Sequence, residues 1–267
     1  MTLEDKHRKL KEYILSLGSV AVAYSAGVDS TFLLKTAHEV LGEHCVAFTA
    51  VSSLFAKEEL EEAVEFCKKE GIKHYCISLD LLKEECFHTN PSNRCYYCKH
   101  KIFGAMMEKA KEEGIGFILE GSNLDDLGDY RPGRRAIEEL EIKSPMLEVS
   151  LTKKDIRELS KKLGLPTATK QSAACLASRI PYGQEITKEK LVLIEQGERV
   201  LKNLGFTYYR VRLHGNLARI EVKACDIERL AKKEIREKVT TEFRKIGFSY
   251  VSLDLEGYRM GSLNEVL

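Results

Sequence analysis

The chain has 267 residues, 43% of them hydrophobic, and its 42 basic and 41 acidic side chains give a formal net charge of +1. This amount of apolar material predicts one large globular domain or two smaller ones, and it excludes a disordered chain. The balanced charge argues against an extensive basic surface, so no nucleic acid is expected as a partner.

The start of the chain and its apolar runs favour a cytoplasmic protein. Glu4 and Asp5 stand where a signal peptide would be basic, and no apolar core follows them. No apolar run approaches the ~18–20 residues that a membrane span needs, so no membrane partner is expected. In such a protein, the eight cysteines favour buried inert positions and metal or thiol chemistry over a disulfide framework.

Apolar periodicity predicts alternating helices and strands in the N-terminal part of the chain. In chain order, we expect helices over 3–17, 31–41, 57–70, 81–86 and 97–113, and strands over 20–24, 45–51, 73–79 and 116–120. This alternation favours an α/β fold, a doubly wound parallel sheet with helices on both faces. Residues 121–135, rich in Gly, Asp and Arg, are expected to form a functional loop, and a further helix is expected from Thr152 to about Gly164.

The sequence pattern changes near Pro181 and Gly183. Beyond them we expect helices over 188–204 and 227–246, and strands over 208–213, 218–222 and 250–255. These elements suffice for a small α+β domain. We therefore expect two domains, 1–180 and 181–267, the second serving substrate binding or oligomerisation.

Residues 25–30 (Ser-Ala-Gly-Val-Asp-Ser) follow the first predicted strand and open a helix. The first N–H groups of a helix have no intrahelical partner, and the helix dipole attracts anions to this end. Gly27 lets a phosphate approach the backbone, whereas Asp29 favours Mg²⁺ binding or loop orientation. A capped turn is the alternative, but the position after a parallel strand favours an anion site. The residues assigned to this anion site are Ser25, Gly27, Val28, Asp29 and Ser30.

A Cys-x-x-Cys pair, Cys95 and Cys98, is predicted at the start of a helix, where thiols form thiolates more readily. A redox dithiol and a structural zinc site are both open interpretations, although zinc would need a second pair. The surrounding patterns predict core positions for Cys45, Cys67 and Cys76, and leave Cys86 and Cys225 undecided.

Cys175 lies in a run of small residues, 171–178, that ends at Arg179. Small residues allow close backbone approach, and a cationic neighbour such as Arg179 favours a thiolate. Three thiolates can hold a [4Fe–4S] cluster through three of its irons and leave the fourth open to another ligand. The spacing alone does not join Cys175 to Cys95 and Cys98.

Long motifs in a fixed order make the chain similar to known families. Residues 25–30 resemble the SGGxDS loop of the PP-loop ATP pyrophosphatases, with Ala26 where that pattern has Gly. Most of the chain resembles the LarE-type ATP-dependent sulfur transferases, which act in making the nickel-pincer cofactor of lactate racemase. The motifs that carry this resemblance are 95–99, 121–126, 129–133, 144–146, 174–183 and 210–215.

The resemblance implies a reaction and its cofactors. The substrate would be pyridinium-3,5-biscarboxylic acid mononucleotide, whose carboxylates are adenylated with ATP and Mg²⁺ and then become thiocarboxylates. The sulfur would come from Cys175 itself, which becomes dehydroalanine, or from a [4Fe–4S] cluster on Cys95, Cys98 and Cys175 that carries an extra sulfide. The presence of Cys95 and Cys98 favours the cluster type. A homo-oligomer and a separate sulfide donor are also implied.

The remaining candidates follow from this resemblance and from residue chemistry. They are Cys175, Lys99, Ser178 and Arg179 in catalysis, Asp125 and Asp126 at the nucleotide or Mg²⁺, and Arg131, Arg210 and Arg212 at the substrate phosphate. Arg210 and Arg212 lie two apart on a predicted strand, so their side chains share one face, and an exposed strand face is the alternative. Surface roles are expected for His214 and Arg219.

Three other functions stay open. A PP-loop tRNA thiolase would need an extensive basic surface or an added RNA-binding module. An ATP-dependent amidotransferase-like synthetase would activate a carboxyl group for ammonia and would not need Cys175. A binding module with zinc on Cys95 and Cys98 would leave the loop at 25–30 unexplained.

Overall fold

The computed structural model describes residues 1–128, 132–171, 174–259 and 261–262. The chain forms two compact units: residues 1–80 with 93–173, and residues 81–92 with 174–267. It therefore passes between the units after residues 80, 92 and 173. The short segment 81–92 belongs with the C-terminal residues, and each unit is described by itself below.

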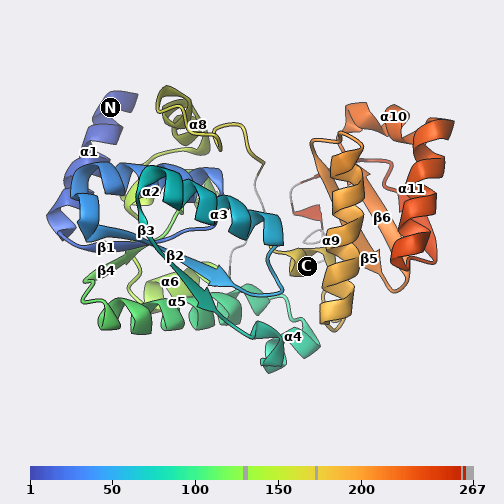
Figure 1. The fold of residues 1–267 in the computed structure, drawn as a ribbon, viewed down its shortest axis with the longest axis horizontal. Coiled ribbons are helices and arrows are strands. Elements are labelled where there is room, and N and C mark those ends of the chain that lie inside the picture. The colour runs from blue at the N-terminus through green and yellow to red at the C-terminus, as the bar shows by residue number, and fades with distance from the viewer. Residues whose placement is uncertain (129–131, 172–173, 260, 263–267) are drawn as a thin grey trace. The chain divides into compact units, whose positions relative to one another are not determined.

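A four-stranded parallel sheet forms the centre of the first unit, in the order β3-β2-β1-β4 (Figure 1). Its strands are β1 (Val20–Ala23), β2 (Cys45–Val51), β3 (Lys73–Ser78) and β4 (Phe117–Leu119). Val20 lies opposite both Cys45 and Phe117, because β1 pairs with β2 on one side and with β4 on the other. The chain runs outward from β1 to β3 and then crosses to β4, so the loops after β1 and β4 flank the switch point where such sheets bind ligands.

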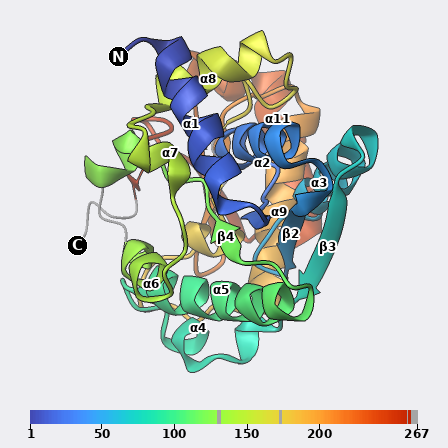
Figure 2. The ribbon, with the colours of Figure 1, turned by 90° about the vertical axis from the view of Figure 1, so that its left-hand side faces the viewer.

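Helices cover both faces of this sheet, which confirms the doubly wound α/β fold (Figures 1 and 2). Val20 and Val22 face one apolar core and Ala21 faces the other, as expected for side chains that alternate along a strand. The first core includes α1 (Leu3–Leu17), α2 (Val28–Leu41), α3 (Lys57–Glu70), α7 (Pro145–Glu148) and α8 (Lys153–Lys162); the second includes α5 (Arg94–Glu112) and α6 (Gly133–Glu139). Short 3₁₀ helices are η1 (Gly42–His44) and η3 (Leu124–Gly128).

The second unit contains a three-stranded sheet in the order β5-β6-β7. Its elements are β5 (Tyr209–His214), β6 (Leu217–Val222), β7 (Tyr250–Leu253), α4 (Glu85–Thr89), α9 (Lys188–Asn203), α10 (Ile227–Ala231), α11 (Lys233–Ile246), η2 (Leu81–Lys83), η4 (Leu176–Arg179) and η5 (Ala224–Asp226). β5 and β6 are antiparallel, whereas β6 and β7 are parallel. α9 approaches α11 closely at Gly197, where an added Cβ would lie 3.3 Å from the Phe243 ring.

Three expected elements differ from the structure. The single helix expected over 81–86 is the 3₁₀ helix η2 followed by α4, which begins at Glu85 and ends at Thr89. The loop expected over 121–135 contains the start of α6, because Gly133 opens a helix directly after Pro132. The single helix expected over 227–246 is two helices, since Lys232 adopts an extended conformation between them (ψ 137°). None of the helices in the described ranges is long and apolar enough to cross a membrane.

Candidate active site

The turn between β1 and α2 has an unusual backbone conformation at Ala26. This residue is buried and has φ of +52°, in the left-handed region that residues with a Cβ seldom adopt. The SGGxDS pattern has glycine at this position, and glycine reaches positive φ freely. The turn therefore follows the path that a glycine would favour, although the chain has alanine there.

Two hydroxyl groups close this turn onto the first residues of α2. The Ser25 N–H donates to Ser30 Oγ (3.2 Å), and the two Oγ atoms are 3.1 Å apart. Ser30 Oγ also donates to the carbonyl of Gly27 (3.3 Å), the N-cap residue of α2. Gly27 has no side chain to cap the helix, so the N-terminal N–H groups of α2 suit an anionic ligand.

Asp29, in the first turn of α2, is ion-paired with Lys153. The Asn123 amide lies 3.5 Å from the other carboxylate oxygen of Asp29. Burial raises the pKa of Asp29, and the nearby Lys153 opposes this by lowering it. Lys153 was not predicted from the sequence, because it lies 124 residues from Asp29 and has no local signal beyond the capping box of Thr152 and Asp155.

The loop after β4 packs directly against the start of α2. A Cβ on Gly121 would lie 3.3 Å from Asp29 Cβ and 3.4 Å from the Ser30 nitrogen, so glycine permits this close approach. In the same loop, Asp126 is buried and accepts from the Asn123 N–H (3.0 Å). Asp125 is exposed and accepts from the Lys153 N–H (2.7 Å), which ties the loop to the start of α8.

Two further charged residues that the sequence analysis missed hold this edge of the sheet. The Lys170 ammonium group donates to the Ala26 carbonyl (2.9 Å) and is ion-paired with Glu62. Glu120, which follows β4, is buried and accepts from the Ser122 N–H (3.0 Å) and from the Ser144 hydroxyl. Within the first unit, Lys153 and Lys170 thus approach the turn at 25–30 from a segment more than 120 residues away.

Cys95 and Cys98 lie in the first turns of α5, three residues apart and therefore on one face of the helix. Cys95 is exposed and Cys98 is half-buried. α6 begins against this turn, because a Cβ on Gly133 would lie 3.2 Å from the Cys95 carbonyl and 2.7 Å from Lys99 Cδ. The structure therefore brings Cys95, Cys98 and Lys99 together.

In the second unit, the backbone around Cys175 is held by Arg179 and Ser178. Arg179 is buried and makes a bidentate pair with Glu198 of α9 (2.8 and 3.0 Å). Its remaining nitrogen donates to the carbonyls of Ala174 (2.7 Å) and Cys175 (3.1 Å). The Ser178 hydroxyl also donates to the Cys175 carbonyl (2.8 Å), so both side chains fix the main chain that carries the thiol.

Arg210 and Arg212 share one face of β5, and both are buried, so the alternative of an exposed strand face is wrong. Arg212 makes a bidentate pair with the buried Glu221 (3.0 and 2.9 Å) and donates to the Ser178 carbonyl (2.8 Å). The Arg210 guanidinium lies 5.1 Å from the centre of the Tyr258 ring, and burial lowers the pKa of Arg210. Both arginines therefore belong to the buried charged layer beside the Cys175 segment.

The other candidates are distributed as follows. Cys45 and Cys67 are buried as expected, but the core position expected for Cys76 is wrong, because β3 is an edge strand that exposes it. Arg131, with the rest of 129–131, lies outside the described residues.

Across the described ranges, no group of three or more His, Cys, Asp or Glu side chains could hold a metal ion. Cys95 and Cys98 belong to the first unit and Cys175 to the second.

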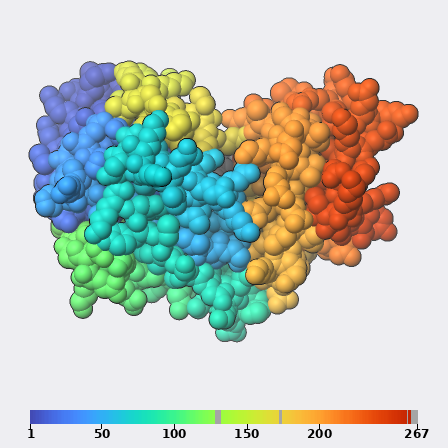
Figure 3. Space-filling model, viewed as in Figure 1, coloured from blue at the N-terminus to red at the C-terminus, as the bar shows by residue number. Residues whose placement is uncertain are grey.

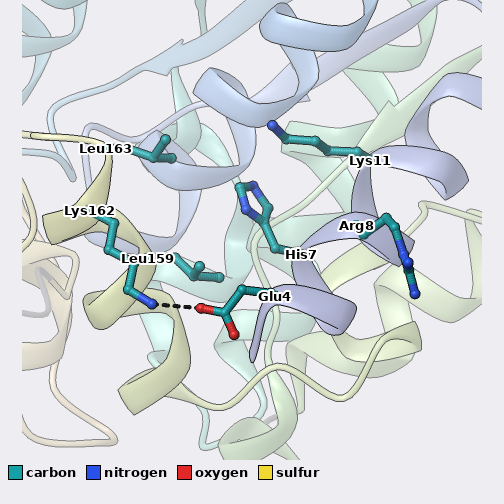
Figure 4. Close-up of a pocket in the computed structure, with 7 residues that line it drawn as sticks. All are labelled: Glu4, His7, Arg8, Lys11, Leu159, Lys162 and Leu163. Atoms are coloured by element: carbon teal, nitrogen blue, oxygen red, sulfur yellow. Dashed lines mark hydrogen bonds and ion pairs between the residues drawn. The ribbon is translucent and has the colours of Figure 1, made fainter. Parts of the chain in front are cut away.

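A cavity of about 290 Å³ lies elsewhere in the first unit, between α1 and α8 (Figure 4). In the space-filling view, the yellow residues of α8 lie at the surface beside the dark blue residues of α1 (Figure 3). Leu159 and Leu163 supply apolar lining, and Lys162 of the rim is ion-paired with Glu4 (2.8 Å). None of the predicted site residues lines this cavity, so the candidate site remains the edge of the sheet where β1 and β4 end.

Several known proteins are similar to this chain. No protein-family model matches the chain. The chain is 41% identical to an uncharacterised protein of Synechocystis over 99% of both chains. It is 34% identical to the pyridinium-3,5-bisthiocarboxylic acid mononucleotide synthase of Lactiplantibacillus plantarum, over all of this chain and 96% of that protein. A tRNA-specific 2-thiouridylase of Leptospira interrogans is 27% identical over 66% of this chain and 58% of its own length.

Proposed function

The chain belongs to the LarE-type family of ATP-dependent sulfurtransferases in the PP-loop superfamily, and from this membership we propose its substrate and the roles of its residues. The substrate is pyridinium-3,5-biscarboxylic acid mononucleotide, which the enzyme adenylates with ATP and converts to thiocarboxylates. The observation that carries the proposal is the turn at 25–30, which ends β1 in a glycine-like conformation and packs against the loop after β4.

The turn at 25–30 binds the phosphates of ATP. Its N–H groups and the hydroxyls of Ser25 and Ser30 are hydrogen-bond donors, and the α2 dipole favours negative charge at this end. Lys153 and Lys170 supply the cations that pyrophosphate requires as a leaving group. Lys153 is paired with Asp29 in this structure. When ATP is bound, its ammonium group contacts a phosphate instead.

The carboxylates of Asp29 and Asp125 are the ligands proposed for Mg²⁺. Carboxylate oxygens suit this ion. Asp29 already pairs with a cation, the Lys153 ammonium group, and Asp125 lies near the same residue because it accepts from the Lys153 main-chain N–H. Magnesium, when bound, neutralises charge on the phosphates. Asp126 is buried and positions the loop instead.

Cys175, Cys95 and Cys98 are proposed to hold the transferred sulfur through a [4Fe–4S] cluster. Cys95 and Cys98 fit this role because they are accessible and lie on one face of α5, while Ser178 and Arg179 fix the backbone of Cys175. The cluster, when bound, would carry a sulfide on the iron that has no cysteine ligand. Lys99 lies one residue after Cys98 and neutralises the carboxylate of the substrate near these thiols.

Adenylation makes the substitution of oxygen by sulfur feasible. A carboxylate oxygen is a poor leaving group, whereas AMP is a good one, so a sulfur nucleophile can displace AMP from the acyl adenylate. Arg210, Arg212 and Arg131 are proposed to bind the phosphate of the substrate, because guanidinium groups form paired hydrogen bonds with phosphate. The product would serve the nickel-pincer cofactor of lactate racemase, in the cytoplasm, with a homo-oligomeric enzyme and a separate sulfide donor.

Purification without oxygen tests the sulfur source. We expect brown protein with about four irons per chain. Cys175→Ala should abolish thiocarboxylate formation and leave ATP–pyrophosphate exchange intact, whereas Cys225→Ala, at an exposed cysteine, should leave both intact. A colourless wild-type protein whose Cys175 becomes dehydroalanine during turnover would replace the cluster with the sacrificial route. Zinc in place of iron would contradict the cluster.

A further inference from the structure

Asn90 is a fully buried polar residue at the end of α4. Its backbone has φ of +44° and ψ of 58°, in the left-handed region, where asparagine is among the better tolerated residues. A buried amide in this conformation must find its hydrogen bonds within the protein, because water does not reach it. Its partners therefore indicate what the residue does.

The Asn90 side chain and backbone both bind the turn that follows the Cys175 motif. Asn90 Nδ2 donates to the carbonyls of Ile180 (3.3 Å) and Pro181 (2.8 Å), and the Asn90 carbonyl accepts from the Gly183 N–H (3.0 Å). One turn earlier, the Phe87 carbonyl accepts from the Ile186 N–H (3.0 Å). These four hydrogen bonds, together with the one between His88 Nδ1 and Glu185 Oε1 (3.0 Å), join two segments of the second unit that lie about ninety residues apart in the chain.

These two segments lead directly to the two groups of cysteines. Asn90 lies five residues before Cys95, and Ile180 lies five residues after Cys175. We propose that Asn90 is a positioning residue, which holds the chain leading into Cys95 and Cys98 at a fixed place relative to the Cys175 turn. This inference rests on the proposed function, in which the three thiols act together.

The amide suits this role better than other side chains of similar size. Two N–H donors match two carbonyl acceptors, and removing them costs both hydrogen bonds, although the Pro181 carbonyl still accepts from the Gln184 N–H (3.2 Å). Aspartate in its ionised form would set a negative oxygen against the same two carbonyls. Glycine would keep the left-handed backbone at no steric cost but would lose both side-chain hydrogen bonds.

The test compares thiol cross-linking in Asn90→Gly and Asn90→Asp with the full-length, metal-free wild type. Dibromobimane, which joins two nearby thiols, is the probe, and peptide mass spectrometry identifies links from Cys175 to Cys95 or Cys98. We expect both variants to form these links about ten-fold more slowly than wild type, the effect of one to two lost hydrogen bonds. Asn93→Ala, which removes an exposed amide three residues away, is the matched control and should cross-link like wild type.

ATP–pyrophosphate exchange is measured in the same proteins and should stay within about two-fold of wild type, since the turn at 25–30 lies in the other unit. If the wild type cross-links and Asn90→Gly does so equally fast, the side-chain hydrogen bonds of Asn90 do not position the thiols. Only its left-handed backbone then matters, and the positioning role is wrong. If the wild type forms no link from Cys175 to either thiol, the three-thiol site of the proposed function fails, and the role of Asn90 fails with it.

Discussion

At the scale of single residues, Ala26 shows how far a motif constrains the backbone. The place of Ser25, Gly27 and Asp29 between a strand and a helix could be predicted from sequence, because a buried strand followed by a Gly- and Ser-rich turn has one general geometry. The positive φ of Ala26 could be suspected only from the glycine that similar loops have there. Lys153 and Lys170 could not be predicted, because they reach the turn through tertiary packing alone.

Substitution of Ala26 tests this backbone conformation. Ala26→Val should lower the free energy of unfolding by about 2–3 kcal/mol, because a β-branched residue is strained at positive φ and this site is buried. Ala26→Gly should stay within about 1 kcal/mol of wild type and retain ATP–pyrophosphate exchange. Urea unfolding measures both, and equal stability of the valine and glycine variants would show that the turn does not need this conformation.

Lys153 offers a second test at the same scale. Lys153→Ala should weaken ATP binding by about ten-fold or more through the loss of a charge-assisted contact, while Lys154→Ala, at the exposed neighbouring position, should not.

Lys153→Ala should also show a pH effect on stability. Without Lys153, burial should raise the pKa of Asp29 further. A carboxyl group whose pKa is raised in the folded protein lowers the free energy of unfolding as the pH rises through that pKa. The stability lost in Lys153→Ala should therefore shrink as pH falls, and a pH-independent loss would contradict the ion pair.

At the scale of elements, regular amphipathic segments were predictable and interrupted ones were not. The helix over Lys57–Glu70 and the strand over Cys45–Val51 match their expected bounds, since a clear apolar period ends at a glycine or a turn. α6 was missed because Gly133 and its neighbours have the composition of a loop, and its helix depends on packing against α5. The break at Lys232 also has no local signal, because the charged pattern continues through it.

Alanine should change stability in opposite directions at two glycines, Gly121 in the contact between the loop after β4 and α2, and Gly104 outside this contact. Gly121→Ala should destabilise the protein by about 1–2 kcal/mol and weaken ATP binding, since its Cβ would press on Asp29 and Ser30. Gly104→Ala, in the interior of α5 with no atom within 4 Å of the added Cβ, should stabilise by up to about 1 kcal/mol. Thermal unfolding with ATP titration compares them, and equal effects at the two positions would contradict the close approach of this loop.

At the scale of the whole molecule, chain connectivity is what the sequence could not reveal. The doubly wound sheet followed from the alternation of strands and helices, and the comparisons agree with it. The placement of segment 81–92 with the C-terminal residues depends on contacts such as those of Asn90, across about ninety residues. Both cysteine-bearing segments follow a point where the chain passes between units, Cys95 after residue 92 and Cys175 after residue 173. Local patterns carry no information about such crossings.

The most direct test of the account is one reaction of the anaerobically purified protein with ATP, Mg²⁺ and pyridinium-3,5-biscarboxylic acid mononucleotide. High-resolution mass spectrometry of the products is combined with quantification of AMP and pyrophosphate. We predict a product in which sulfur replaces a carboxylate oxygen, with one AMP and one pyrophosphate released for each sulfur incorporated. Release of AMP and pyrophosphate with a product that contains no sulfur would contradict the account.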